Sequence, residues 1–279
     1  MKITLVPYAG LCNRLNAIAS GLAYKEKHPD VDLKILWHKW FHCNCRFKDL
    51  FKQLPSQYPP VQELMWQIKD IPGHKLNFNI PQKLRSLWYD FSFLDCDNAD
   101  HFDEKIKDKK NIYVYHANRF CKEETHQDLA KIFFPTDELQ NRIDEVTKNW
   151  NDKNVIGLHI RRTDNINAIN KSPIELFYKI IDEELSKDND ALFYIASDEK
   201  AVKETMSKRY GNHIISIPLC LKRNCKQGMK DAVVDLFCLG KTNKIYGSAH
   251  STYSTFAAEL FGTKITIVGE QPIINTHTL

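Results

Sequence analysis

Residues 155–164 read Val-Ile-Gly-Leu-His-Ile-Arg-Arg-Thr-Asp, and the architecture of the second half of the chain follows from them. The first six are mostly apolar and β-branched, which is typical of a strand buried on both faces of a parallel sheet. Two arginines, a hydroxyl and a carboxylate follow at once. A buried charge without a partner costs several kcal/mol, so these residues belong where solvent, a ligand or a counter-charge can reach them. In an open α/β sheet that place is the crevice beyond the carboxyl ends of the strands.

Two interpretations of the pair Arg161 and Arg162 follow from this placement. The planar guanidinium can pair with two oxygens at once, so two arginines at a strand end match a pyrophosphate group. Alternatively, Asp164 and an arginine form a structural ion pair at the end of the strand. The stretch favours the pyrophosphate interpretation, and the structural pair stays open.

The rest of the second half alternates between strand and helix, which predicts a parallel sheet. Ser172, Pro173 and Glu175 predict a helix start, with the serine as N-cap and an acid in the first turn. The predicted strands are 155–160, 191–196, 213–217, 244–246 and 264–268, and the predicted helices are 173–186, 199–209, 230–239 and 251–261.

The first half begins with a strand at residues 2–7, a turn that starts at Gly10, and a helix with an apolar stripe. A helix N-terminus beside a strand end directs backbone N–H groups and the helix dipole at the crevice. Asn13 and Arg14 would stand there. The alternative is that Asn13 caps the helix and Arg14 is solvated. Further strands are predicted at 32–37 and 111–116 and a helix at 137–150, whereas 54–110 give no clear pattern.

Length and linker composition predict two domains. The chain has 279 residues, which suits two domains of about 130 residues each. Asp152-Lys-Asn154 is the predicted link, so the domains are expected at 1–151 and 152–279. The predicted fold class is therefore α/β, with two Rossmann-like domains that face a cleft.

The bulk properties exclude several classes of function. The net charge of +4 is mild, and the chain has no nucleic-acid motif. This charge is compatible with an anionic ligand or a weak attraction to an acidic membrane surface. Met1-Lys2-Ile3 leads straight into a strand without a signal peptide, and no apolar run approaches the ~20 residues of a membrane span. We expect a cytoplasmic protein that does not bind nucleic acid.

Cysteine spacing gives little support for a metal site. The gap in Cys43-Asn-Cys45 is shorter than in a zinc knuckle, and Cys220 and Cys225 lack a matching second pair. Without secretion, the cysteines are expected to be thiols. The eight cysteines are at positions 12, 43, 45, 96, 121, 220, 225 and 238.

Three further polar clusters fall at predicted strand ends or helix starts. Ser197 and Asp198 could bind a base or ribose edge, or could simply cap the next helix. Asp231 and Asp235 share one helix face and repel each other, so a cation is expected nearby, with Arg161 or Arg162 as the candidate. The hydroxyl-rich turn 247–255 opens a helix and suits a phosphate, although it could be only an N-cap. Together with the arginines, these clusters predict a metal-free site for a nucleotide diphosphate.

The same residues resemble a known group of enzymes. His159-Ile-Arg-Arg-Thr-Asp164, Tyr194-Ile-Ala-Ser-Asp198 and Asp231-Ala-Val-Val-Asp235 followed by Gly247-Ser-Ala-His-Ser-Thr252 are similar to three motifs of the α1,6-fucosyltransferases, nodulation fucosyltransferases and protein O-fucosyltransferases. Gly10-Leu-Cys-Asn-Arg-Leu15 resembles the N-terminal Gly-x-x-Asn-Arg element of that superfamily. The likeness covers most of 155–260 and, more loosely, 8–51.

The resemblance implies a GT-B fold and an inverting, metal-independent transfer of fucose from GDP-fucose, or a related GDP-sugar, to a glycan acceptor. A lipid-linked acceptor would bring peripheral membrane contact. Arg161 and Arg162 would be catalytic and hold the diphosphate, with Arg161 neutralising charge on the leaving phosphate. The donor-binding residues implied by position are His159 and Asp198 at the guanosine end, Asp235 at guanine or the arginines, Ser251 and Thr252 at phosphate, Asn13 and Arg14 from the other domain, and also Asp164 and Asp231.

One feature departs from the pattern of the α1,6 enzymes. We call residues 159–164 the arginine motif. In the α1,6 enzymes a glutamate shortly after this motif serves as general base, whereas 165–170 here read Asn-Ile-Asn-Ala-Ile-Asn. Transfer to a hydroxyl needs a base within hydrogen-bond reach. Asp164 and Glu175 are the nearest carboxylates in sequence, and an acid of the N-terminal domain is equally suitable. The missing acid motivates an alternative function, a non-catalytic nucleotide- or glycan-binding protein of the same fold.

Overall fold

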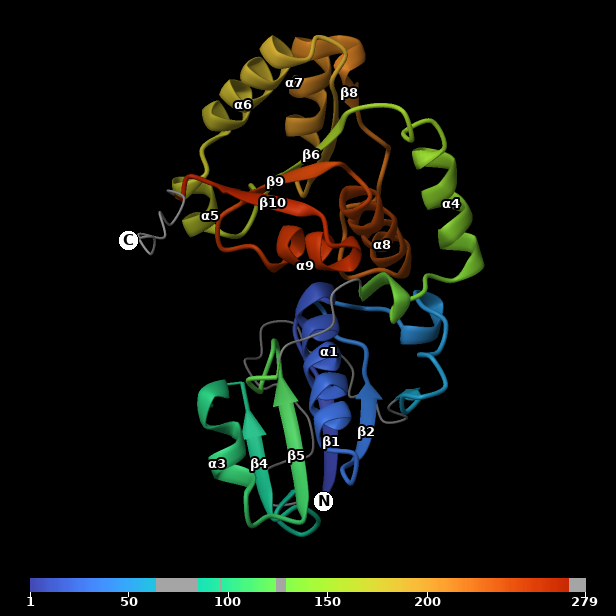
Figure 1. Cartoon of the computed structure of the whole chain (residues 1–279), viewed down its shortest axis with the longest axis vertical. Coiled ribbons are helices and arrows are strands. Elements are labelled where there is room, and N and C mark those ends of the chain that lie inside the picture. Colours follow the sequence, from blue (N-terminus) through green and yellow to red (C-terminus); the bar gives the residue numbers. More distant parts are fainter. Residues whose placement is uncertain (64–84, 96, 124–128, 271–279) are drawn as a thin grey trace, which may run out of the picture. The chain divides into compact units, whose positions relative to one another are not determined.

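The computed structural model describes residues 1–63, 85–95, 97–123 and 129–270 (Figure 1). Part of the unclear stretch 54–110 therefore lies outside the described residues, and Cys96 is among the residues outside them. The other seven cysteines are thiols that form no disulfide within the described part of the chain. Among the described helices, none has the length and apolar character that crossing a membrane requires.

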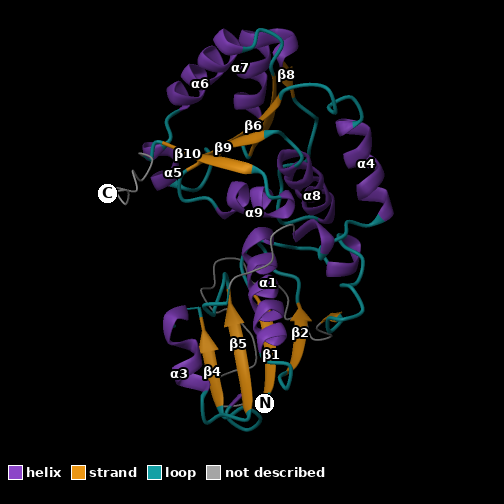
Figure 2. Ribbon diagram, in the orientation of Figure 1, coloured by secondary structure: helices purple, strands orange, loops and turns teal. Residues whose placement is uncertain are grey.

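The first half of the chain forms a five-stranded parallel sheet in the order β3-β2-β1-β5-β4 (Figure 2). Three of its strands match the predicted ranges, whereas β3 and β4 fall in the stretch that gave no clear pattern. The elements are β1 (Lys2–Pro7), α1 (Leu11–Lys27), β2 (Asp32–Trp37), β3 (Val61–Glu63), β4 (Phe91–Leu94), α3 (Phe102–Ile106) and β5 (Asn111–His116), with short 3-10 turns at Phe47–Asp49, Ala99–His101 and Leu129–Lys131.

The second half forms another five-stranded parallel sheet, in the order β10-β9-β6-β7-β8. All five strands of this half were predicted, and so were its helices α6–α9. Most of these predictions agree with the structure to within one or two residues at each end. The elements are α4 (Asp137–Thr147), β6 (Val155–Ile160), α5 (Ile166–Lys171), α6 (Ile174–Lys187), β7 (Leu192–Ser197), α7 (Lys200–Tyr210), a 3-10 turn (Gly211–His213), β8 (Ile214–Ile215), α8 (Lys226–Gly240), β9 (Lys244–Ser248), α9 (Thr252–Phe261) and β10 (Lys264–Val268).

Strand β6 is the centre of the second sheet, and every one of its residues is buried. Ile156, Leu158 and Ile160 pack with Phe177 of α6 and Phe193 of β7 in one apolar cluster. Each such side chain contributes about 1.5–3 kcal/mol when it leaves water. The predicted doubly covered strand is confirmed.

Contacts divide the chain into two compact units, each interrupted in sequence. One contains Met1–Gln140 and Lys222–Val233, and the other contains Asn141–Leu221 and Val234–Leu279. The predicted domains 1–151 and 152–279 stay a prediction; the division by contacts lies within α4 and assigns 222–233 to the first unit. This segment joins the first unit because Asn44 Nδ2 donates to the Asn224 carbonyl at 3.0 Å and Lys226 Nζ donates to Asp49 Oδ1 at 2.7 Å.

The start of α6 differs from the prediction. Pro173, not Ser172, is the N-cap, and it makes no side-chain cap. Ser172 instead closes the unpredicted helix α5, and its hydroxyl donates to the Val268 carbonyl at 2.6 Å. A serine before a proline predicts a cap from local sequence, but here Ser172 Oγ accepts the backbone N–H of Ala249 at 2.9 Å instead of one from α6.

Candidate functional site

The order of the second sheet makes the carboxyl end of β6 a topological switch point, because the chain leaves β6 toward β7 and later returns to its other side as β9. Ligands of open α/β sheets bind at such points. Arg161 and Arg162 directly follow β6. The structure thus brings the predicted arginine pair to the position at which this class of sheet binds ligands.

Arg161 is held by two carboxylates and remains partly accessible. Its Nη2 donates to Asp164 Oδ1, and its Nε lies 3.7 Å from Asp198 Oδ2. The side chain is 19% exposed, and Nε has no hydrogen-bond partner among the described residues. The structural Arg–Asp pair considered from the sequence is therefore present. It leaves donor capacity on Arg161.

Arg162 is anchored to backbone carbonyls. Its Nη2 donates to the Ser172 carbonyl at 2.6 Å, and its Nη1 donates to the Arg161 carbonyl at 3.3 Å. Burial lowers the pKa of this guanidinium from its ordinary value, while Glu175 and Asp198 act in the opposite sense. Arg162 therefore links the arginine motif to the end of α5.

Asp198 holds the arginine motif from the neighbouring strand. Its Oδ1 accepts the backbone N–H of Arg162 at 2.8 Å, and its Oδ2 accepts the Thr163 hydroxyl at 2.7 Å. Ser197 does not cap α7: its hydroxyl donates to the Ile160 carbonyl at 2.7 Å, and the N-cap is Glu199. Both residues fasten the end of β7 to the end of β6.

The turn between β9 and α9 lies beside the arginine motif. Ser248 Oγ accepts the backbone N–H of Arg161 at 3.0 Å and donates to the His159 carbonyl at 3.1 Å. His250 has a φ of 53°, a left-handed conformation that is rare for a residue with a side chain. Asn165 Nδ2 donates to its carbonyl at 3.0 Å and so fixes the turn.

The N-terminus of α9 follows this turn. Ser251 is its N-cap, with Oγ accepting the backbone N–H of Tyr253, and Thr252 is the first helical residue. The N-cap that was the alternative interpretation of this turn is therefore present. The free N–H groups of a first helical turn attract anions, so the predicted phosphate contact is compatible with this geometry and stays a prediction.

The first unit uses a similar turn before α1. Ala9 has a φ of 64° and precedes Gly10, which is the N-cap. Arg14 is fully buried, so the alternative of a solvated side chain is excluded. Its Nε donates to the Ala9 carbonyl at 2.8 Å, its Nη1 donates to the His38 carbonyl, and its guanidinium lies 4.9 Å from the Trp37 ring.

Asn13 is half-buried in the first turn of α1, so it is not the N-cap considered from the sequence. The donor contacts predicted for Asn13 and Arg14 stay predictions.

His159 is buried and neutral near pH 7. Its ring stacks on that of Tyr253, with centroids 5.1 Å apart. Burial and the charge of Arg161 lower its pKa to about 3. Nδ1 has no hydrogen-bond partner among the described residues, so His159 offers a neutral ring nitrogen next to the arginine motif.

Asp235 lies in a second polar cluster, and its neighbours correct one prediction. Its Oδ1 accepts the Tyr194 hydroxyl at 2.7 Å, and its Oδ2 lies 3.4 Å from the Tyr253 hydroxyl. The nearby cation is Lys203 of α7, whose Nζ lies 3.7 Å from Oδ1. The expected partners Arg161 and Arg162 instead form the contacts described above.

Asp231 is buried one helical turn before Asp235, and its Oδ1 accepts a hydrogen bond from Gln227 Nε2 at 2.8 Å.

Sequence reasoning missed several residues that shape the site. Lys203 lies in a polar helix and looks like an ordinary surface lysine. The carbonyl contacts of Ser172 and Asn165 join segments far apart in sequence, so local patterns carry no signal for them. The hydroxyl of Tyr194 was also missed, although its place in a buried strand should have prompted a search for a partner.

No protein-family model matches the chain, and no curated protein matches it by sequence. Solved structures do match. The α1,6-fucosyltransferase NodZ, soaked with GDP-fucose, has a TM-score of 0.59 at 17% identity over 93% of this chain and 92% of that one. A NodZ structure from Bradyrhizobium has a TM-score of 0.57 at 16% identity over the same shares.

Two other fucosyltransferase structures match as well. FUT1 of Arabidopsis thaliana in complex with GDP has a TM-score of 0.61 at 15% identity, over 95% of this chain and 69% of that one. POFUT1 has a TM-score of 0.54 at 10% identity, over 96% and 98%. The likeness spans nearly the whole chain and confirms the predicted α/β architecture with the GT-B fold of these proteins.

Proposed function

We propose that the protein is an inverting glycosyltransferase that moves a sugar, fucose, from a GDP-sugar to a glycan acceptor without a metal at the donor. The observation that carries the proposal is the arginine motif at the switch point of the second sheet, where Arg161 is partly accessible and beside the anion-attracting start of α9. The shared fold with GDP- and GDP-fucose-bound transferases supports it.

The chemistry follows from charge. When the bond between sugar and diphosphate breaks, negative charge grows on the leaving phosphate, and a fixed guanidinium stabilises that charge without reorganisation. Arg161 serves this role in the proposal, with Asp164 and Asp198 orienting it. Arg162, whose Nη groups are engaged by carbonyls, positions the motif and contributes its remaining donor, Nε.

The remaining donor-binding assignments form part of the same proposal. His159 and Asp198 contact the guanosine end, Asp235 contacts guanine, and Ser251 and Thr252 bind phosphate. Asp164, Asp231, Asn13 and Arg14 complete the set carried over from the resemblance.

The donor assignment is tested by a thermal-shift panel in the presence of EDTA. GDP is expected to raise the melting temperature, because a ligand that binds only the folded state stabilises it. UDP and ADP should raise it much less. A GDP shift that appears only with added Mg²⁺ would contradict the metal-independent part of the proposal, and equal shifts for all three nucleotides would contradict the donor assignment.

The role of Arg161 is tested by Arg161→Ala. Loss of one preorganised donor to developing charge costs about 10²–10³ in kcat, and the melting temperature without GDP should change little. Arg209→Ala is the matched control, because Arg209 is half-exposed and stacks on Tyr178 with its guanidinium 4.4 Å from the ring. Equal transfer by the two variants would refute the assignment.

The alternative, a non-catalytic binding protein, is favoured by one observation: α5, at the place where the α1,6 enzymes carry their glutamate, contains no acid. Free fucose released from GDP-fucose without acceptor separates the two functions. Slow release that Arg161→Ala abolishes supports the transferase. Binding of GDP-fucose with no release supports the alternative.

A further inference from the structure

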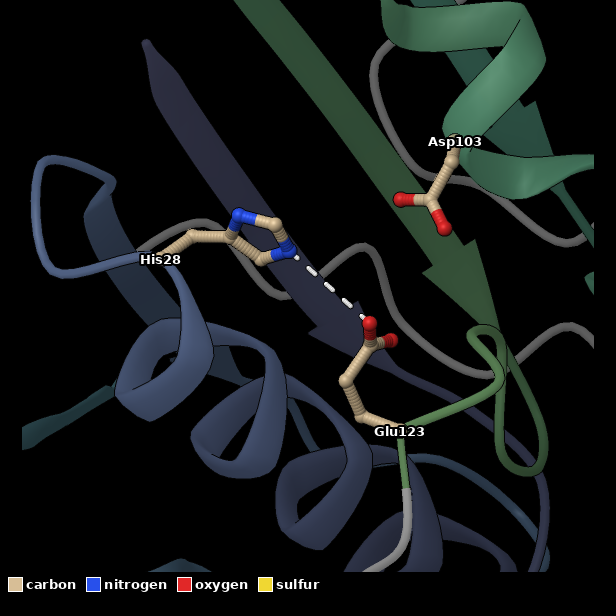
Figure 3. Close-up of side chains that lie close together, drawn as sticks. All are labelled: His28, Asp103 and Glu123. Carbon is tan, nitrogen blue, oxygen red and sulfur yellow. Dashed lines mark ion pairs between the residues drawn. The ribbon is translucent and has the colours of Figure 1, made fainter.

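Three side chains with metal-ligating atoms meet in the first unit (Figure 3). His28 ends α1, Asp103 lies in α3, and Glu123 follows β5. One ligand atom from each lies within 4.8 Å of the others. The three residues come from separate segments, and none of them takes part in the chemistry proposed above.

Glu123 is the buried member of the cluster, and one of its carboxylate oxygens has no partner in the part of the chain that the structure describes. Its side chain is only 6% exposed, and Oε2 has no hydrogen-bond partner among the described residues. Oε1 lies 3.4 Å from Lys27 Nζ and 3.8 Å from His28 Nε2, both longer than a typical hydrogen bond to a charged group. The Cys121 thiol and Lys27 also hydrogen-bond to this carboxylate. A buried carboxylate oxygen without a partner is costly, so Oε2 is the atom that a further positive group would satisfy.

The other two ligands are held in place by a shared neighbour, Tyr24. The ring of His28 lies 4.3 Å from that of Tyr24, and the His28 backbone N–H donates to the Tyr24 carbonyl at 2.9 Å. The Tyr24 hydroxyl hydrogen-bonds to Asp103. Outer contacts of this kind orient metal ligands in proteins. The His28 side chain is 41% exposed, which leaves a path for an ion.

The ligand set selects the class of ion. Imidazole suits first-row transition metals, whereas Mg²⁺ and Ca²⁺ prefer oxygen alone. Bonds of about 2.0–2.2 Å in a tetrahedral site place ligand atoms about 3.4 Å apart. The exposed His28 and Asp103 side chains can close the remaining gap by rotation. We propose that His28, Asp103 and Glu123 bind a divalent transition-metal ion, with Zn²⁺ as the best match and water as a further ligand.

The site would tie the C-terminal end of α1 to α3 and to the segment after β5, so its effect is on the stability of the first unit. Lys27 competes for Glu123. Its ammonium offsets part of the charge that the metal would neutralise.

The experiment measures metal binding itself, independently of any transferase activity. The full chain is stripped with EDTA, dialysed, and titrated calorimetrically with ZnCl₂, and a Co²⁺ absorption spectrum reports the coordination. We expect one site of this kind, a Zn²⁺-dependent rise in melting temperature and no competition from millimolar Mg²⁺. Asp103→Asn should weaken Zn²⁺ binding by more than about tenfold. Because Asp103 is exposed, this change should not prevent folding.

Two controls sharpen the test. His101 and Glu104 form an exposed pair 3.0 Å apart near the same helix, so His101→Gln should leave Zn²⁺ affinity unchanged. Lys27→Met removes the competing charge and should tighten binding. Zn²⁺ affinity that is the same in the unaltered protein, Asp103→Asn and Glu123→Gln would overturn the proposal, as would a loss in His101→Gln equal to that in Asp103→Asn.

Discussion

Lys203 and Asp235 show how a residue acquires its role from its surroundings. Both side chains are more than nine-tenths buried, and their charged atoms lie 3.7 Å apart, too far for a hydrogen bond. Burial raises the pKa of Asp235, and the Lys203 charge and the tyrosine hydroxyls oppose that rise. In a buried pair, removal of one partner leaves an uncompensated charge, which costs more than the pair contributes.

Lys203→Met should therefore lower the free energy of unfolding by about 3–5 kcal/mol, measured by urea denaturation. The double variant Lys203→Met, Asp235→Asn should recover part of the loss, because it removes both charges. Lys200→Met, on the same helix and paired with Glu204 at the surface, should cost less than about 1 kcal/mol. Equal losses at the two lysines would show that the buried pair has no special weight.

The pKa of His159 makes stability depend on pH. In the unfolded chain a histidine titrates near 6.5, whereas burial and Arg161 lower the folded pKa of His159 to about 3. Between these values the unfolded state binds more protons, so the unfolding free energy falls as the pH falls, by up to about 1.4 kcal/mol per pH unit.

Substitution of His159 by Asn removes this contribution. The difference in unfolding free energy between the unaltered protein and His159→Asn should shift in favour of the variant from pH 7 to pH 4. His38 also has a pKa lowered to about 3, by burial and by Arg14, and His38→Asn should show the same trend. A constant difference across this range would contradict the buried, neutral state of both rings.

At the scale of elements, the sequence predicted what is local and apolar. Strand β6 is a run of six consecutive buried residues, and such a continuous apolar run is visible in the sequence. Strand β4, by contrast, has one fully buried residue, Phe93, and α5 has only Ala168, so neither leaves a periodic signal. The site followed the same rule: the arginines were found from their place after a strand, whereas Lys203 and Asn165 depend on contacts that only the folded chain creates.

Gly157 shows an element-scale constraint within β6. A Cβ at this position would lie 2.7 Å from both Leu239 Cδ1 and Thr242 Oγ1. Gly157→Ala should therefore destabilise the protein by about 1–3 kcal/mol through overpacking, although alanine normally stabilises by limiting the unfolded chain. At Gly10 a Cβ meets nothing within 4 Å, so Gly10→Ser should stabilise α1 by adding a cap. Urea midpoints that rise for both variants would contradict the close packing of β6.

At the scale of the whole molecule, the two units are variations on one architecture. Each has a five-stranded parallel sheet. In each, a residue with positive φ lies in the turn between a strand and the next helix: Ala9 between β1 and α1, and His250 between β9 and α9. In each case a side chain holds the carbonyl of that residue: Arg14, five residues later, in the first unit, and the distant Asn165 in the second. Backbone strain of this kind persists where the surroundings fix it, and it often marks functional sites.

The two proposed sites use different residues, although the donor set includes Asn13, Arg14 and Asp231 of the first unit. The arginine motif belongs to the second unit, and the cluster of His28, Asp103 and Glu123 belongs to the first. The two sites share no residue, so the affinity for GDP is expected to be the same with and without saturating Zn²⁺. Calorimetric titration with GDP in the two conditions measures this directly, with Asp103→Asn as the control for Zn²⁺ bound elsewhere. Because coupling is reciprocal, a GDP affinity that changes with Zn²⁺ in the unaltered protein but not in Asp103→Asn would refute independence and would require Zn²⁺ affinity to change by the same factor when GDP is bound.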